Sequence, residues 1–410
     1  MAINSKYKNG FISQIEASQR GEVTFIPNPL DRVGDIFNLM QSRYVLISGA
    51  TGAGKTSYAD YNYILAPWSM KEAGLLNDIY WEVNYFSLER KQMFKHAKWV
   101  SWMMYRDDNK MLLSADEIMG WKSGPLNTEG YNLVRSYDDE MSSLLEHVHI
   151  HDGKVSASTV SKIITRRALE LGDLFKSDED GVLFRDNPVY IERFDDKNLL
   201  EQTKTGPRKY IELTHNNVAF RIYQDDHRYF MNNPRSFVFF VIDGINLLGD
   251  KGVIDDISVE LADARDIYGF SPVVVTQQNR AMGDIQRMKL HGNDLSPQLE
   301  DIFKSSQMGF DADLVLGLFD PYRYKAFDKT GSYDGYCLKP MDITNNSLSM
   351  RTPNGVNRFR SLHILKNTFG ADGGKFGMKF LGECNHFETL PFPDNDVLMQ
   401  KVYLDIRQGL

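Results

Sequence analysis

The sequence predicts an α/β protein built on a doubly wound, mainly parallel sheet with a β-rich insertion. Three observations predict it. Short apolar runs that are typical of buried strands alternate with helix-compatible stretches along most of the 410 residues. A glycine-rich turn follows the first of these runs and precedes a helix-compatible stretch. Residues 173–235 interrupt the alternation with short β-rich pieces that are separated by acidic and glycine-bearing turns. Regular alternation of strand and helix is typical of a parallel sheet covered on both faces.

The apolar runs bounded by turn residues are predicted to be strands. In order, they are YVLIS (44–48), WEVNYFS (81–87), HVHIH (147–151), FVFFVI (237–242), PVVVT (272–276), DLVLGLF (313–319) and SLHIL (361–365). NPVYIERF, KYIELTH and VAFRIYQ predict an antiparallel insertion, and FGMKFLGECNHFETL (376–390) predicts a closing β-hairpin. Helices are expected at 11–20, from Lys55 to about Leu65 with Pro67 as the stop, and at 89–106, 156–171 and 253–267.

Composition bounds the domain organisation and the class of protein. We expect an N-terminal arm with a linker helix at 1–40, one large domain at 41–390 that contains the 173–235 insertion, and a C-terminal tail at 391–410. The 47 basic and 55 acidic residues give a net charge of −8, which argues against a protein that binds nucleic acid over its whole surface but not against a local DNA-binding groove or pore. Only two cysteines occur, so a disulfide scaffold and a multi-cysteine zinc module are excluded. No apolar run could cross a membrane and no signal-peptide core is visible, which predicts a cytoplasmic protein.

The turn after the first strand carries the clearest chemical signal. YVLIS-GATGAGKTS has the spacing G-x-x-x-x-G-K-T, between an apolar strand and a helix. Backbone N–H groups of such a glycine loop converge on phosphate oxygens, and the lysine reaches the β- and γ-phosphates. A hydroxyl at Thr56 can ligate Mg²⁺. The sequence therefore predicts a P-loop that binds ATP and magnesium. Its nucleotide-binding candidates are Gly49, Gly52, Gly54, Lys55, Thr56 and Ser57.

A magnesium site next to a P-loop needs an acidic residue at the end of a neighbouring strand. Asp243 is the first charge after the apolar run FVFFVI, which favours it as the second magnesium residue beside Thr56. A solvated aspartate at a strand end is the alternative. Hydrolysis also needs a group that orients or deprotonates water. Gly244 follows Asp243, so this base must come from elsewhere, and Glu89 at the end of the next strand is our candidate. The alternative for Glu89 is a helix N-terminal glutamate that the helix dipole favours.

Several ordered segments resemble one family. FSLER (86–90) is similar to the F-S-L-E-M segment of DnaB-type replicative helicases, and PVVVTQQNR (272–280) resembles their strand ending in S-Q-L-N-R. Further similar segments are HVHIHDGKVSASTVSKIITRRALELG, LSPQLEDIFKSSQMGFDADLVLGLFDPYRY and LHILKNTFGADGGKFGMKFLGECNHFE. The resemblance implies a RecA-like P-loop NTPase. Because only 48 residues precede Gly49, it also implies a compact, phage-like version without the N-terminal primase-binding domain.

The resemblance assigns roles to four residues. It implies Glu89 as catalytic base, Asp243 as the magnesium residue and Gln277 as a sensor of the γ-phosphate. Lys366 would reach the γ-phosphate of a neighbouring subunit. The family's accompanying arginine is replaced by Thr368, which cannot supply a charged planar fork. Three alternatives stay open: Lys366 works alone, another arginine such as Arg323 or Arg360 takes over, or hydrolysis is slow.

The resemblance further implies a ring of identical subunits, expected to be a hexamer, with single-stranded DNA in its central pore. The loop after the strand that ends at Asp243 and the loop after the strand that ends at Gln277 would contact DNA phosphates. The candidates are Lys251, Arg280, Arg287 and Lys289, although a solvated mixed-charge loop is the alternative. The function implied is an ATP-driven helicase in DNA replication, in a bacterial or phage-infected cell, with a primase or loader as a further partner. The alternative is a recombination, loading or assembly ATPase that does not unwind processively.

Overall fold

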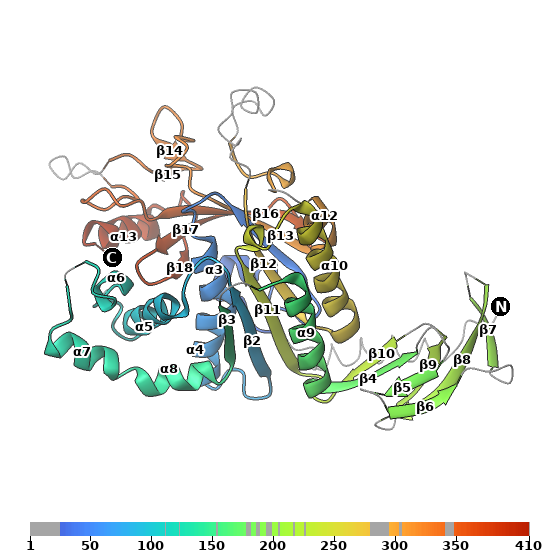
Figure 1. Cartoon of the computed structure of the whole chain (residues 1–410). Coiled ribbons are helices and arrows are strands. Elements are labelled where there is room, and N and C mark those ends of the chain that lie inside the picture. Colours follow the sequence, from blue (N-terminus) through green and yellow to red (C-terminus); the bar gives the residue numbers. More distant parts are fainter. Residues whose placement is uncertain are drawn as a thin grey trace.

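The computed structural model describes the chain from residue 25 onwards, with internal gaps. The described residues are 25–110, 112–122, 124–152, 155–177, 182–185, 189–193, 199–203, 206–215, 218–224, 227–278, 295–302, 306–340 and 348–409. The helix predicted at 11–20 lies outside them. Figure 1 shows a main body with helices around a large twisted sheet, and an arm of short strands that projects from one side.

The main sheet has nine strands in the order β18-β17-β16-β13-β1-β12-β11-β2-β3. The six strands from β13 to β3 pair in parallel, and β16, β17 and β18 continue the sheet antiparallel. All seven predicted strands lie in this sheet, and the closing hairpin is confirmed as β17 and β18. The bounds are β1 (Val45–Gly49), β2 (Tyr80–Ser87), β3 (Val148–Asp152), β11 (Ser236–Asp243), β12 (Ser271–Gln277), β13 (Leu314–Phe319), β16 (Phe359–Asn367), β17 (Lys375–Leu381) and β18 (His386–Thr389).

Helices cover both faces of this sheet, as the doubly wound prediction requires. One apolar cluster joins α3 (Lys55–Asp60), α4 (Ala66–Glu72) and α5 (Gln92–Asp108) to one face. The other cluster joins α9 (Ala157–Leu171) and α10 (Lys251–Tyr268) to the opposite face. The central strands β1 and β11 are buried along their whole length, because both of their faces are covered. In the described part of the chain, no helix is both long and apolar enough to cross a membrane.

The first helix does not stop at Pro67, which corrects the sequence prediction. After α3, residues Tyr61–Leu65 form a π-helical turn, and the chain continues as α4 to Glu72. Pro67 lies in the first turn of α4. Proline is tolerated there because its missing N–H group would have no partner within the new helical segment. A change of helical type before the proline therefore keeps the chain helical.

Several elements were not predicted from the sequence. Residues between α5 and β3 form the short helices α6 (Ala115–Ile118), α7 (Thr128–Arg135) and α8 (Asp138–Leu145). The segment predicted as a C-terminal tail contains α13 (Asp396–Arg407), whose Met399 and Ile406 are buried in a third apolar cluster. The smaller elements are α2 (Asp31–Gly34), α12 (Ser306–Asp311), β14 (Ser332–Tyr333), β15 (Tyr336–Cys337) and 3₁₀ turns at Ile245–Leu247 and Leu299–Asp301.

The insertion is antiparallel, as predicted, and forms the projecting arm. It contains one sheet in the order β10-β4-β5-β6 and another in the order β7-β8-β9. Phe175, Ile211 and Ile222 form its buried apolar cluster. The strands are β4 (Gly172–Ser177), β5 (Val182–Arg185), β6 (Val189–Arg193), β7 (Leu199–Thr203), β8 (Gly206–His215), β9 (Val218–Tyr223) and β10 (His227–Met231).

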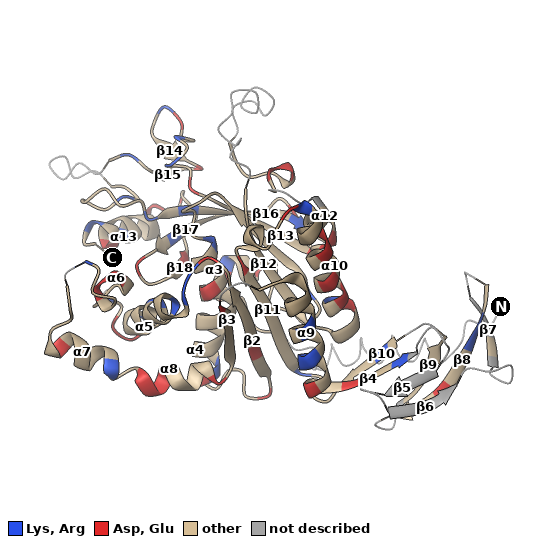
Figure 2. Ribbon diagram, viewed as in Figure 1, with Lys and Arg blue, Asp and Glu red and all other residues tan. Residues whose placement is uncertain are grey.

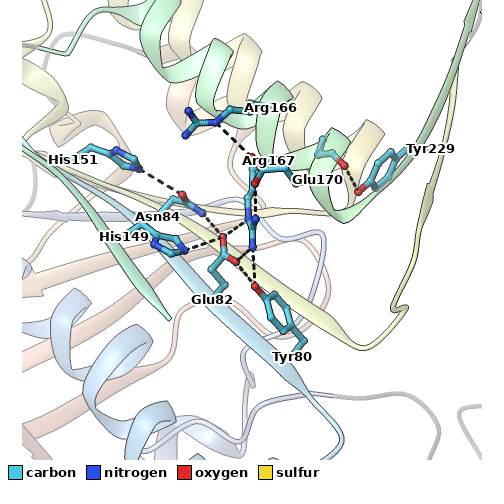
Figure 3. A network of polar contacts seen from close by, with 10 residues as sticks. Tyr80, Glu82, Asn84, His149, His151, Arg166, Arg167, Glu170 and Tyr229 are labelled. Carbon is cyan, nitrogen blue, oxygen red and sulfur yellow. Dashed lines mark hydrogen bonds and ion pairs between the residues drawn. The ribbon is translucent and has the colours of Figure 1, made fainter. Parts of the chain in front are cut away.

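A polar network fastens the base of the arm to the main sheet (Figure 3). Glu82 of β2 is fully buried, and Arg167 of α9 donates to both of its carboxylate oxygens, with the Nε–Oε1 distance at 2.7 Å. Burial alone would raise the pKa of Glu82, but hydrogen bonds from Arg167 and Tyr80 outweigh burial and lower it. The hydroxyl of Tyr229, on β10, donates to the Ala168 carbonyl of α9 at 2.9 Å. Since α9 continues directly into β4, this network holds the arm through α9.

Candidate active site

The P-loop has the geometry of a phosphate cradle. β1 ends at Gly49 and α3 begins at Lys55. Gly52 and Gly54 have φ angles of 80° and 99°, in the left-handed region that side-chain-bearing residues avoid. A Cβ atom on Gly49 would lie 2.6 Å from the Leu318 carbonyl oxygen, so this position also requires glycine. The loop therefore places backbone N–H groups and a helix N-terminus around one concave turn, as phosphate binding requires.

The lysine and the acidic residue of the motif lie on the same side of the cradle. The Lys55 ammonium donates to the Ala50 carbonyl at 3.0 Å. Burial lowers the pKa of Lys55, and the nearby carboxylates of Glu89 and Asp243 oppose that shift. Asp243 is fully buried at the end of β11, and its Oδ1 accepts a hydrogen bond of 2.8 Å from the Thr56 hydroxyl. This pair of hard oxygen donors fits Mg²⁺.

Glu89 approaches the acidic residue because the residue after Asp243 is glycine. Gly244 has a φ angle of 93°, and a Cβ atom there would lie 2.6 Å from Cγ of Glu89. A side chain at this position would therefore displace Glu89. A side chain at position 244 and the side chain of Glu89 would thus compete for the same space. The glycine after Asp243 is therefore what allows Glu89, just after β2, to lie beside it.

Gln277 also joins the cradle. β12 pairs with β1 in parallel, with Gln277 opposite Gly49, and the Gln277 side-chain amide donates to the Thr51 hydroxyl of the P-loop. The structure therefore brings together the side chains of Lys55, Thr56, Asp243, Glu89 and Gln277 at the carboxyl edge of the parallel strands. Ligands of open α/β sheets bind at this edge.

Two arginines that we considered as replacements for the missing arginine lie against this chain's own P-loop. Arg360 is buried and donates to the Ala53 carbonyl at 3.0 Å, with Asp320 at 3.3 Å from its guanidinium. Burial lowers the pKa of Arg360. Arg323 is exposed and donates to the Thr51 carbonyl. Arg360 is therefore a buried structural support of this chain's P-loop, whereas Arg323 is an exposed arginine beside the same loop.

Lys366 lies near the end of the sheet that is opposite the P-loop. It pairs with Val315 near the start of β13, whereas the P-loop follows the other end of the neighbouring strand β1. Its ammonium donates to the carbonyls of Gly309 and Phe310 at 3.1 and 2.8 Å, and these residues belong to α12. The structure thus separates Lys366 from the cluster around Lys55. Its role toward a neighbouring subunit stays a prediction.

The predicted DNA-contacting residues are only partly described. Arg280, Arg287 and Lys289 lie outside the described residues. Lys251 is exposed at the first position of α10. The outward face of this helix carries acidic side chains, among them the exposed Asp256, Glu260 and Asp263 (Figure 2). Lys251 lies at the N-terminal end of α10, about half a helical turn around from this acidic face, so the described part of the helix offers phosphate one exposed lysine beside an acidic surface.

Sequence reasoning missed a pair of buried charges behind the magnesium residue. Lys95 of α5 and Asp60 of α3 are each 1% exposed, and the Lys95 ammonium lies 3.3 Å from Asp243 Oδ2. Both residues fall in helices that the sequence predicts, at Lys55 to about Leu65 and at 89–106. A charged residue at an inward position of each helix was the available signal, but it could not show that the two would meet.

Comparisons with known proteins support the fold. No protein-family model matches the sequence, and no curated protein matches it. The structure is similar to that of a DnaB-like replicative helicase studied with its interactions with primase, with a TM-score of 0.55 and 15% identity over 93% of this chain. The chain spans 66% of the length of that helicase. It is also similar to the solved ATPase domain of a second helicase, with a TM-score of 0.56 and 16% identity, over 95% of this chain and 100% of that domain. The chain therefore has a RecA-like P-loop fold similar to that of the ATPase domains of DnaB-like replicative helicases.

Proposed function

We propose that this protein is an ATP-dependent DNA translocase that forms a ring and unwinds DNA during replication. The observation that carries this proposal is the convergence of Lys55, Thr56, Asp243, Glu89 and Gln277 at one edge of a helicase-like sheet. A site with these groups has a phosphate cradle, a magnesium ligand pair, a carboxylate for water and a polar contact to the loop. These are the groups that hydrolysis of a nucleoside triphosphate needs.

Each residue has a distinct task in this proposal. The backbone of residues 49–54 and the Lys55 ammonium bind the phosphates of ATP. Glu89 orients the attacking water and accepts its proton. Gln277 gains a partner in the γ-phosphate and returns to Thr51 after cleavage, which couples hydrolysis to the chain that follows β12. Magnesium, held by Thr56 and Asp243, would neutralise charge that develops on the phosphate oxygens.

The ring and its DNA extend the proposal beyond one chain. In this arrangement Lys366 leaves the carbonyls of α12 and contacts the γ-phosphate bound by a neighbouring subunit. Single-stranded DNA passes through the pore, with Lys251, Arg280, Arg287 and Lys289 at its phosphates. A hexamer, a primase or loader partner, and a cytoplasmic site of action in a bacterial or phage-infected cell are part of the same proposal.

A second candidate function is a RecA-like ATPase that acts in recombination, loading or assembly without processive unwinding. The bonds of Lys366 to Gly309 and Phe310 favour it, together with Thr368 in the position of the expected arginine. A subunit whose Lys366 is held by its own α12 suits a switch that hydrolyses ATP slowly.

Unwinding of a forked DNA substrate, with ATP hydrolysis measured in parallel, tests the two functions. The samples are wild type, Lys55→Ala and a control, Lys71→Ala, which removes a lysine at the far end of the same helical run. The helicase proposal expects wild type and Lys71→Ala to unwind the fork, single-stranded DNA to stimulate hydrolysis, and Lys55→Ala to lose both activities. Hydrolysis that single-stranded DNA does not change, without strand separation, would support the assembly ATPase instead.

A further inference from the structure

A buried lysine lies directly behind the proposed magnesium site. Lys95 is one turn inside α5, the helix that follows Glu89, and its side chain points into the core. Its ammonium lies 3.3 Å from Oδ2 of Asp243, 3.4 Å from Oδ1 of Asp60 and 2.5 Å from the Tyr85 hydroxyl. One ammonium therefore bridges two carboxylates, one on the P-loop helix and one on the strand that ends at the magnesium site.

This bridge completes the contacts of the Asp243 carboxylate. Oδ1 accepts from the Thr56 hydroxyl, and Oδ2 faces Lys95. A carboxylate with a partner at each oxygen cannot rotate freely about its terminal bond. Groups that bond to a metal-binding side chain in this way orient it toward the metal ion. Asp243 is thus fixed in its orientation by one contact that faces the nucleotide and one that faces the core.

Asp60, which holds the Lys95 ammonium, is in turn held by side chains from two other parts of the chain. The second oxygen of Asp60 accepts from the Trp99 indole at 3.2 Å and from the Asn385 amide at 3.1 Å. Burial raises the pKa of Asp60, and the Lys95 charge opposes that shift. Lysine is rarely buried unless it is paired, and breaking a buried pair is costly. The position of Lys95 therefore depends on Asp60, and that of Asp243 on Lys95.

We propose that Lys95 is a positioning residue for the magnesium carboxylate: it holds Oδ2 of Asp243 so that the side chain is oriented before Mg²⁺-nucleotide binds. This inference rests on the proposed function, because it gives Lys95 a task at the same site. The competing explanation is that Lys95 only neutralises Asp60 within the core. In that case, the contact with Asp243 would have no effect on magnesium.

A double variant separates these explanations. Asp60→Asn/Lys95→Met removes one negative and one positive charge, so the net charge beside Asp243 is unchanged and the Asp60–Lys95 pair leaves no single charge behind. Lys95→Met alone leaves two buried carboxylates and is expected to fold poorly, so it cannot decide the question. Lys98→Met is the matched control, because Lys98 lies on the same helix and its ammonium donates to the Gly382 carbonyl.

The measurement is the Mg²⁺ concentration that gives half-maximal binding of a fluorescent ADP analogue, together with binding of the same analogue in EDTA. We expect the double variant to need about 10- to 100-fold more Mg²⁺ than wild type, with binding in EDTA unchanged. Lys98→Met should match wild type. An unchanged Mg²⁺ requirement in a folded double variant would overturn the role of Lys95. Failure of wild type to bind the analogue with Mg²⁺ would instead overturn the proposed function.

Discussion

The nucleotide edge of the main sheet, meaning the carboxyl ends of its parallel strands with the candidate site, is built differently from the arm. The edge rests on strands that are buried on both faces, and its buried carboxylate Asp243 has partners from two other elements. Among the described residues of the arm, Phe175, Ile211 and Ile222 form a separate apolar cluster. A core shared by many elements fixes the site rigidly, whereas the arm packs around a cluster of its own, and separately packed parts of a protein can open independently. The difference teaches that the site and the arm can be changed separately.

One strand nevertheless connects the two regions. Glu82, near the start of β2, binds Arg167 of α9, which leads into the arm, and Glu89 follows the end of the same strand. Displacement of α9 would therefore act on β2 at the end opposite Glu89. Substitutions in each region therefore measure how independent the two regions are.

Glu89→Gln is expected to have the largest effect. The amide can still fill the space beside Gly244 but cannot accept a proton, so hydrolysis should fall by about 10²- to 10⁴-fold while nucleotide affinity is retained. Steady-state hydrolysis and equilibrium binding of ATP measure the two quantities. Glu146→Gln, an exposed change before β3, is the control. A Glu89→Gln protein with wild-type hydrolysis would remove Glu89 from the site and weaken the contrast between edge and arm.

The sequence alone could predict which residues meet at the nucleotide edge, because the residues that form it stand in short local motifs. Glycines that need positive φ angles, a lysine and a threonine stand together in the P-loop, and Asp243 follows an unbroken apolar run. Pairing in parallel order then brings β2, β11 and β12 to the same edge. The Lys95 bridge could not be predicted, since Asp60 and Asp243 lie 35 residues before it and 148 residues after it. The continuation through Pro67 depends on a π-helical turn for which no residue pattern is specific.

Arg167→Met is expected to destabilise the joint between α9 and β2. It leaves the Glu82 carboxylate buried without its cation, which typically costs about 3–5 kcal/mol. Denaturant unfolding measures the loss. Arg166→Met is the matched control, because Arg166 is exposed and lies 3.8 Å from Glu170 in a surface pair of little energetic value. Equal stability of the two variants would mean that the network in Figure 3 does not fasten the arm.

The same variant has a distinct pH dependence. In the wild type the pKa of Glu82 is lowered, so this carboxylate stabilises the fold above its ordinary pKa and loses that contribution as the pH falls through the folded-state value. Without Arg167, burial dominates and raises the pKa. The contribution of Glu82 then improves as the pH falls. Unfolding curves between about pH 3 and 7 should therefore show a smaller or reversed acid destabilisation in Arg167→Met. An unchanged slope would contradict the assignment.

Ile222→Ala is expected to have the smallest effect, confined to the arm. Ile222 is fully buried in a cluster that includes Phe175 and Ile211, and truncation of such a side chain costs about 2–3 kcal/mol where few neighbours surround the cavity. Hydrogen exchange should rise in β8 and β9, while exchange in β1 and β11 and basal ATP hydrolysis stay at wild-type values. Ile257→Ala is the contrast, because Ile257 is a buried residue of α10 in the core cluster of the main domain, and its truncation should weaken that whole domain. If Ile222→Ala also loosens β1 and β11, the arm and the nucleotide edge unfold as one unit and their separate construction has no energetic consequence.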